Sequence, residues 1–226
     1  MKIPSWWKKP RTISLLVPEV SWVLPYAKEV ANYLSSNGDK ANLCHDSEDI
    51  PTNGITFFFS WLKIIPPELL DRSYLNLVIH ASDLPKGRGF SPMPWQIIQG
   101  NNEIVVCLFE AVSELDAGPV VFRDKINFKG HELIDELRKK LGEIHINLVT
   151  RYLDEVQPTA GVPQEKNVSQ HYKRRTNDDS ELDLSKTIEE QFNLLRTVDN
   201  KNYPAFFDYQ EHRYKLVITK MKKEKF

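Results

Sequence analysis

Hydrophobic and polar positions alternate along the first two thirds of the chain with two different periods. Short apolar runs bounded by Gly, Pro, Asn or Asp predict strands over 11–17, 41–44, 55–61, 75–80, 103–110 and 120–128. Apolar residues at three- and four-residue steps predict helices over 22–34, 66–70, 93–99 and 133–152. Strands that alternate with helices predict a three-layer α/β domain with a mostly parallel sheet, which we assign to residues 1–156.

The pattern changes after residue 156. The stretch 157–177 is polar, contains prolines and Gly161, and predicts a linker or excursion loop that carries the basic cluster Lys173–Arg174–Arg175. Apolar spacing then predicts a helix over 184–198 with Ser185 as its N-cap. Two further runs, 205–209 and 212–219, predict a terminal hairpin. We therefore expect residues 157–226 to form a linker loop and a small C-terminal α+β extension.

The predicted strand 75–80 ends on a histidine and opens into a loop rich in glycine and proline, ASDLPKGRGFSP. Open α/β sheets bind ligands outside the carboxyl ends of their strands, so His80 is a candidate functional residue. The alternative is an ordinary strand end with a capped turn. Asp116 follows the next strand in SELDAGPV and is either a turn former or the carboxylate that orients His80 as a general base. In the second case, the two strands would be parallel neighbours, so that the loops after them bring Asp116 to His80.

Composition narrows the classes of function. The net charge of −1 provides no basic field for a nucleic acid, so we expect none as a partner. Cys44 and Cys107 stand far apart without metal-ligand spacing, which favours core residues in a reducing compartment. The chain has no leader-like start, no apolar run of about 18 residues and no glycine-rich nucleotide fingerprint. We expect a cytoplasmic protein that neither spans a membrane nor uses a dinucleotide.

The motifs HASDLPKGRGFSP and LDAG together resemble the formyltransferases that use N10-formyltetrahydrofolate. That family shows Asn-x-His-x-Ser-x-Leu-Pro with Asp-x-Gly downstream. The stretch that begins YKRRTNDDSELD resembles a segment of its sugar-nucleotide and methionyl-tRNA members. The forms DLPKGRGFSP, VCLFEAV and PAFF are most similar to sugar N-formyltransferases of the pseudaminic-acid-pathway type. The resemblance implies a Rossmann-like formyltransferase domain and covers nearly the whole chain from Ile13.

The resemblance also implies roles for individual residues. His80 matches the catalytic histidine and Asp116 the catalytic aspartate, without a metal ion. N10-formyltetrahydrofolate would be the co-substrate. Its pocket would be lined by residues of three segments: Phe58, Lys63, Ile64, Ile65, Val112 and Glu114.

The sequence departs from the family pattern two residues before the histidine, where Val78 replaces the asparagine. Asn76 lies on the same face of the strand but roughly 7 Å away, so it cannot take over that role. Either another donor, such as Ser82, Gln96 or a backbone N–H, stabilises the oxyanion instead, or the activity is weaker than in the family.

The second substrate implied by the resemblance is a nucleotide-linked amino-dideoxy sugar for surface-glycan biosynthesis, a UDP-4-amino-4,6-dideoxy sugar or its dTDP equivalent. Lys86, Arg88 and Arg174 are candidates for its diphosphate, while Trp22 and Trp95 could stack on a ring. The alternatives are a formyltetrahydrofolate hydrolase and a non-catalytic folate- or nucleotide-binding relic, the latter motivated by Val78. A methionyl-tRNA enzyme is disfavoured because such proteins run longer and carry a basic C-terminal domain. The C-terminal helix and hairpin could form a homodimer surface.

Overall fold

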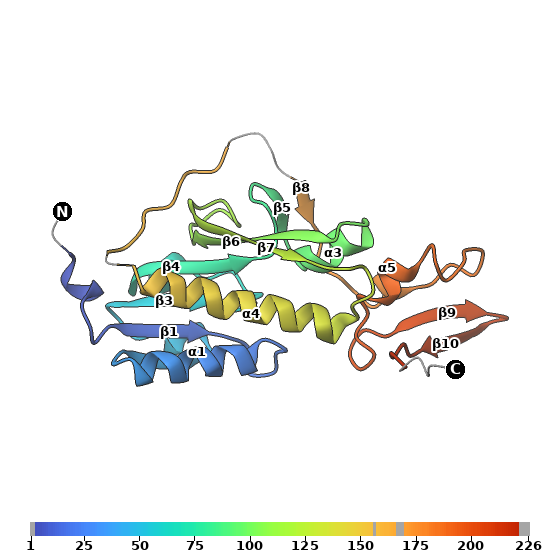
Figure 1. Ribbon diagram of the computed structural model, residues 1–226, viewed down its shortest axis with the longest axis horizontal. Helices are drawn as coiled ribbons and strands as arrows, with labels where there is room; N and C mark the ends of the chain where they lie inside the picture. The colour runs from blue at the N-terminus through green and yellow to red at the C-terminus, as the bar shows by residue number, and fades with distance from the viewer. Residues whose placement is uncertain (1–2, 156, 166–169, 222–226) are drawn as a thin grey trace.

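The computed structural model describes residues 3–155, 157–165 and 170–221 and contains a six-stranded central sheet (Figure 1). The strand order is β2-β1-β3-β4-β6-β7. Neighbouring strands are parallel from β2 to β4, whereas β6 is antiparallel to both β4 and β7. The α/β fold with a mostly parallel sheet is confirmed. The strand bounds are β1 Thr12–Leu16, β2 Lys40–Cys44, β3 Gly54–Phe58, β4 Ser73–His80, β6 Glu103–Glu110 and β7 Val120–Asn127.

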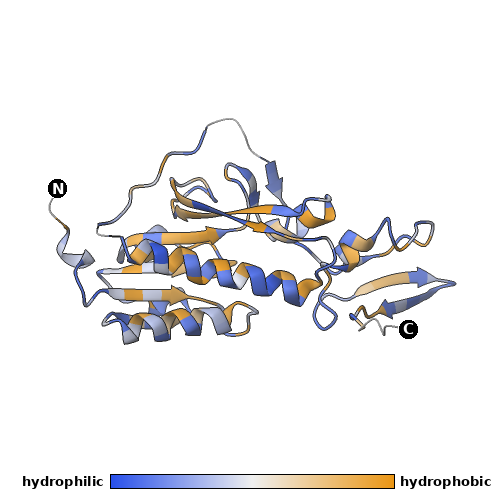
Figure 2. Cartoon of the chain, viewed as in Figure 1, coloured by the Kyte–Doolittle hydropathy of each residue, from blue (hydrophilic) through white to orange (hydrophobic). Residues whose placement is uncertain are grey.

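Two long helices cover one face of this sheet, α1 Leu24–Ser36 and α4 Ile134–Leu153. Successive strand residues point to opposite faces, so alternate positions such as Leu77 and Ile79 join the main core cluster with the apolar stripes of both helices. The polar and apolar stripes along α4 are visible in Figure 2. Shorter helices are α2 Pro67–Leu70 and α3 Pro92–Ile98. None of the helices in the described part of the chain combines the length and hydrophobicity needed to span a bilayer.

The opposite face of the sheet, called the second face below, carries a row of apolar residues that crosses five strands; all are buried except Val78, which is partly buried. Paired positions in this row are Cys44, Leu16, Phe58, Val78 and Phe109. They form two apolar clusters on this face, and Val78 packs against both of them. Val78 is therefore part of the packing of the second face.

A second small sheet lies outside the predicted pattern. Strand β5 (Lys86–Gly89) pairs in parallel with β8 (Gln170–Tyr172). The stretch 157–165, predicted as part of a linker, leaves the end of α4 and arches back toward β5 (Figure 1). Neither strand contains an apolar run, since β5 consists of Lys86, Arg88 and two glycines and β8 is Gln-His-Tyr. Their pairing joins segments about 80 residues apart, so no local pattern predicts it. The expected domain boundary at residue 156 lies outside the described residues.

The predicted helix over 184–198 is wrong for most of its length. Only Phe192–Leu195 (α5) is α-helical. The amide of Gln191 closes the preceding stretch as a loop by accepting from the Asp183 N–H and donating to the Asp183 carbonyl. Ile188, expected on one helix face with Phe192 and Leu195, is 59% exposed, and Leu184 at the start of the predicted helix is 57% exposed. Local side-chain hydrogen bonds have replaced helical ones, a competition to which polar residues are prone.

The terminal hairpin is present as β9 (Ala205–Tyr209) and β10 (His212–Leu216). Three short 3-10 helices complete the described elements: η1 Ser5–Trp7, η2 Ser47–Asp49 and η3 Asp178–Ser180.

Buried charged groups join the extension to the α/β domain. Arg196 is fully buried, donates to the Asn102 side chain at 2.6 Å and lies 3.7 Å from the Glu132 carboxylate. Burial alone would raise the pKa of Glu132, but backbone N–H donors, including that of Lys129, and the Lys140 ammonium lower it to about 2. A charged Glu132 is therefore available to Arg196 over the whole neutral range, which stabilises this contact.

His145 is a histidine that the core keeps neutral. It lies in α4 with 2% of its surface exposed, and its Nδ1–H donates to the Leu141 carbonyl at 2.8 Å. Its Nε2 has no hydrogen-bond partner among the described residues, and the rings of Trp22 and Phe59 lie 6.0 and 5.3 Å away. Burial lowers the pKa of His145 to about 4.

We expect His145 to make the fold sensitive to mild acid. Between the ordinary histidine pKa of about 6.5 and the folded value, only the unfolded chain binds this proton. The resulting loss of unfolding free energy reaches about 3 kcal/mol at the lower end of that window. In urea titrations from pH 7 to pH 4.5, the stability of His145→Leu relative to wild type should therefore rise as the pH falls. A difference that stays constant with pH would contradict the assignment.

Candidate active site

His80 is the last residue of β4, and its side chain lies on the second face of the sheet with 7% exposed. Its Nε2 is 2.8 Å from the carbonyl oxygen of Gly87. A carbonyl only accepts hydrogen bonds, so Nε2 carries a proton and donates it to Gly87. The other ring nitrogen, Nδ1, lies 3.8 Å from Oδ2 of Asp116. The structure thus brings the two candidate catalytic residues together, with the ring orientation set by a loop carbonyl.

The direction of the strand before Asp116 differs from the sequence-based expectation. The expectation that parallel strands bring the two loops together is wrong, because β6 is antiparallel to β4 and its end, Glu110, lies beside Leu77. The loop 111–119 between β6 and β7 therefore folds back over the second face. Asp116 has a φ of 51° there, and its carboxylate accepts the Gly89 N–H at 2.8 Å.

Two segments with exposed apolar side chains flank this pair. Trp61 and Ile65 pack on the same apolar cluster as Ala111, so the segment after β3 and the loop after β6 share one support. The predicted folate-lining residue Phe58 lies within that support at 3% exposed. Exposed positions on the two segments are Leu62 at 53%, Ile64 at 82%, Val112 at 43% and Leu115 at 44%.

The remaining predicted folate-lining residues are charged. Lys63 places its ammonium 5.6 Å from the Trp61 ring centroid. Glu114 is mostly exposed, but its carboxylate accepts a hydrogen bond from Arg88 at 2.8 Å. Glu114 therefore has a partner within the protein.

The two side chains predicted as oxyanion donors, Gln96 and Ser82, differ in their hydrogen bonds. Gln96 donates to the carbonyls of Ala81 and Pro92 at 2.7 and 3.0 Å. Asn76 donates to the Leu70 carbonyl at 2.8 Å. The hydroxyl of Ser82 is buried and has no hydrogen-bond partner among the described residues. Of the two side chains predicted as donors, both N–H groups of Gln96 are engaged, whereas the Ser82 hydroxyl is still available.

The three predicted phosphate contacts differ in their surroundings. Lys86 is exposed at the start of β5. Arg174 is exposed, donates to the Leu62 carbonyl at 3.1 Å and lies 4.8 Å from the Phe90 ring centroid. Arg88 is 9% exposed and bonds to Glu114 and Gln164 instead. A guanidinium already engaged in this way favours a structural role for Arg88.

The two predicted stacking tryptophans lie in different places. Trp95 donates its indole N–H to the Lys173 carbonyl at 2.8 Å and borders the segment after β8. Trp22 packs on Tyr26 and His145 in the cluster beneath α1 and α4, on the face opposite His80. The structure therefore does not bring Trp22 to the candidate site.

Gln164 is a residue of this site that no sequence pattern predicted. Its Nε2 donates to the carbonyls of Asp116 and Gly118, both at 2.8 Å, while its Oε1 accepts from Arg88 at 3.0 Å. A glutamine within a polar stretch carries no periodic signal, and its partners are more than 40 residues away in sequence. Only the folded chain identifies it.

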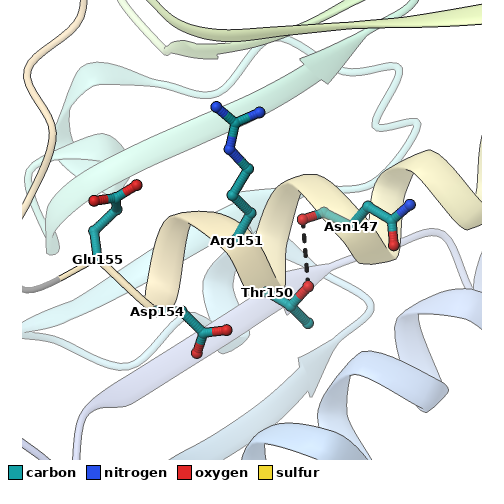
Figure 3. A pocket seen from close by; sticks show the side chains of 5 residues that line it. All are labelled: Asn147, Thr150, Arg151, Asp154 and Glu155. Atoms are coloured by element: carbon teal, nitrogen blue, oxygen red, sulfur yellow. Dashed lines mark hydrogen bonds between the residues drawn. The ribbon is translucent and has the colours of Figure 1, made fainter.

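A separate surface hollow of about 560 Å³ lies at the C-terminal end of α4 (Figure 3). Its lining includes Arg151, whose guanidinium stacks 4.2 Å from the Phe122 ring centroid, together with Asn147, Thr150, Asp154 and Glu155. It contains neither His80 nor Asp116. Within the described ranges, no group of three or more His, Cys, Asp or Glu residues is arranged to hold a metal ion.

Comparison with known proteins places this geometry in a family. Residues 54–153 match the formyl transferase family and include both His80 and Asp116. The chain carries a domain of the formyl transferase family. Strands β4 and β5 and the loop 111–119, which carry the residues around His80 and Asp116, all lie within the matched residues.

Curated relatives of the domain are named methionyl-tRNA formyltransferases. The chain is 28% identical to the protein of Sulfurihydrogenibium sp. over 74% of this chain and 54% of the relative. It is 32% identical to that of Malacoplasma penetrans over 71% of this chain and 52% of the relative. The chain thus spans about half the length of the curated relatives it matches.

Solved structures share the fold over nearly the whole chain. Methionyl-tRNA formyltransferase from Clostridium thermocellum superposes with a TM-score of 0.79 at 21% identity, covering 95% of each chain. A likely sugar N-formyltransferase from Mycobacterium tuberculosis gives 0.70 at 18% identity, covering 94% of this chain and 99% of that one. HypX from Aquifex aeolicus in complex with tetrahydrofolic acid gives 0.65 at 16% identity, over 91% of this chain and 37% of HypX.

The close approach of β5 to β8 at Gly89 allows a test of their pairing. Gly89 has a φ of +98°, and a Cβ there would lie 2.3 Å from the Tyr172 carbonyl oxygen. Gly100 has a similar φ of +92° with nothing within 4 Å of an added Cβ. Gly100→Ala should lower the free energy of unfolding by about 1 kcal/mol, the cost of a left-handed alanine. Gly89→Ala should lower it clearly more in urea titrations, because the added methyl also forces β5 and β8 apart. Equal losses would contradict the pairing.

Proposed function

We propose that this protein transfers the formyl group of N10-formyltetrahydrofolate to the amino group of a nucleotide-linked amino-dideoxy sugar. The sugar would be a UDP-4-amino-4,6-dideoxy sugar or its dTDP equivalent, used in surface-glycan biosynthesis. The observation that carries the proposal is the His80–Asp116 pair, 3.8 Å apart, within a formyl transferase domain. The forms DLPKGRGFSP, VCLFEAV and PAFF, which are most similar to sugar N-formyltransferases, support the sugar acceptor.

The donor would bind between the two apolar segments that flank the pair. Ile64 and Val112 expose apolar surface of the kind that packs against a flat ring system, and Lys63 supplies a positive charge. The same fold is found in HypX, whose structure contains tetrahydrofolic acid. Both observations support a folate as the formyl donor.

The chemical step forms a bond between the sugar nitrogen and the formyl carbon and breaks the bond from that carbon to folate N10. The amine loses a proton and N10 gains one, so a group that moves protons assists both halves. His80 is the candidate for this role, with its Nε2–H held by Gly87 and its Nδ1 facing Asp116. General acid–base assistance of this kind contributes about 10²–10⁴-fold.

Negative charge on the formyl oxygen requires a hydrogen-bond donor, and Val78 offers none. The Ser82 hydroxyl, buried without a partner among the described residues, is the side chain that we assign to this role. Gln96 and Asn76 are already bonded to backbone carbonyls.

The acceptor's diphosphate would be met by Lys86 and Arg174. Both are exposed cations with no carboxylate partner within the described ranges. Trp95 lies close by, since its indole N–H donates to the carbonyl of Lys173, the residue before Arg174. A homodimer formed through the C-terminal helix and hairpin is a further prediction.

We expect incubation with N10-formyltetrahydrofolate and a panel of UDP- and dTDP-linked amino sugars to yield a sugar heavier by one formyl group in mass spectrometry. His80→Asn and Asp116→Asn should each lower turnover by about 10²–10⁴-fold while the circular dichroism spectrum stays unchanged. Charged methionyl-tRNA belongs in the same panel, because curated relatives carry that name. Formylation of the tRNA alone would overturn the sugar acceptor, formate release alone would indicate a hydrolase, and no reaction with any acceptor would indicate a binding relic.

Restoring the family's amide is a second test of the proposal. Val78→Asn should raise kcat by up to about 10²-fold, the scale of one oxyanion donor. It should also lower the free energy of unfolding by about 1–3 kcal/mol, since an amide replaces methyl groups in an apolar row. Val78→Thr is the control, because threonine has nearly the shape of valine and adds a polar group but lacks the reach of an amide. It should lower the free energy of unfolding without raising kcat. A folded Val78→Asn protein with unchanged kcat would contradict the interpretation.

A further inference from the structure

The loop that carries Asp116 is held by a side chain that lies beyond the end of the formyl transferase match. We propose that Gln164, oriented by Arg88, is a positioning residue that sets the Asp116 carboxylate against His80. The effect on catalysis rests on the proposed function. The effect on the geometry of the loop does not.

Asp116 needs such support because the sheet does not provide it. The residue lies at a φ of 51° in the hairpin loop 111–119, and the left-handed region costs about 1–2 kcal/mol for a residue with a side chain. The ladder between β6 and β7 ends at the pair Phe109–Val120. The carbonyls of Asp116 and Gly118 lie beyond that ladder and both accept from the Gln164 amide at 2.8 Å.

Arg88 determines which way the Gln164 amide points. Arg88 donates to Oε1 of Gln164 at 3.0 Å, so the two N–H groups are directed at the loop carbonyls. A flipped amide would place an oxygen against both carbonyls and an N–H against the guanidinium. Arg88 also donates to the Glu114 carboxylate at 2.8 Å. The pair Arg88–Gln164 therefore holds the loop at three points: Glu114, Asp116 and Gly118.

The same pair is connected to the catalytic candidates through β5. Arg88 directly precedes Gly89, whose N–H donates to the Asp116 carboxylate at 2.8 Å. Gly87, on the other side of Arg88, accepts from His80. Loss of the Gln164 amide would let the loop move relative to β5, and with it the carboxylate relative to the His80 ring.

The segment that carries Gln164 is anchored without its amide. Val162 exchanges two backbone hydrogen bonds with Val120, both at 2.8 Å. Gly161 donates its N–H to the Glu110 carboxylate at 3.2 Å. Truncation of the side chain should therefore release the Asp116 loop and leave the backbone path of the segment intact.

The chain provides a matched control for this truncation. Gln191 closes the loop before α5 in the same manner: its Oε1 accepts from Asp183, and its Nε2 donates to the carbonyls of Asp183, Lys186 and Thr187. It is 9% exposed and lies in the C-terminal extension. Gln191→Ala thus removes a comparable set of bonds and leaves the site untouched.

The test combines kinetics with hydrogen exchange of the Gly89 amide, which reports directly on its bond to Asp116. We expect Gln164→Ala and Gln164→Glu to lower kcat by about 10²-fold, the effect of misplacing a reacting group by about 1 Å, with KM for either substrate changed far less. Gln164→Glu keeps the acceptor for Arg88 and loses both donors. In both variants the Gly89 amide should lose protection, as in Asp116→Ala. Gln191→Ala should change neither quantity.

The possible results separate the two proposals. An unchanged Gly89 amide in Gln164→Ala overturns the positioning role, whether or not kcat falls. Loss of protection together with normal kcat overturns its catalytic part. If the wild-type protein transfers no formyl group to any acceptor, the proposed function fails. Loss of Gly89 protection in the Gln164 variants but not in Gln191→Ala would still support the structural inference.

Discussion

The arrangement of the site depends on how closely two backbones approach at Gly89. The residue has a left-handed φ, and its missing side chain lets β5 pair with β8 while its N–H reaches Asp116. Two residues earlier, the Gly87 carbonyl accepts from the His80 ring. One short strand thus contacts both candidate catalytic side chains through its backbone. Since backbone atoms within a paired strand move little, the strand provides a rigid reference for the His80–Asp116 geometry.

Packing and chemistry make opposite demands at position 78. The side chain lies in an apolar row between Phe58 and Phe109, where methyl groups fit without polar partners. An amide at the same place would carry donors and an acceptor into this row, and leaving them unpaired costs free energy. Valine therefore stabilises the second face of the sheet. It also moves the task of stabilising an oxyanion to a group such as the Ser82 hydroxyl.

The chain after residue 156 takes part in the architecture of the α/β domain. Arg196 enters the domain fully buried and meets Asn102 and Glu132. A buried guanidinium is tolerated only with such partners, because desolvation of a charge is costly. Gln164 and β8 also belong to this part of the chain. Gln164 bonds to the loop that carries Asp116, and β8 pairs with β5. The site is thus assembled from segments on both sides of the expected boundary.

Periodicity in the sequence determined the main strands and helices, because burial on one face of each element is a local property of the chain. It also indicated His80 at a strand end, and the LDAG motif indicated Asp116. Local hydrogen bonds of Gln191 overrode an apparent helical pattern over 184–198, which periodicity alone cannot reveal. The direction of β6, the pairing of β5 with β8 and the role of Gln164 were decided by the tertiary structure. Each depends on contacts between residues far apart in the chain, and no local pattern of apolar and polar positions encodes such contacts.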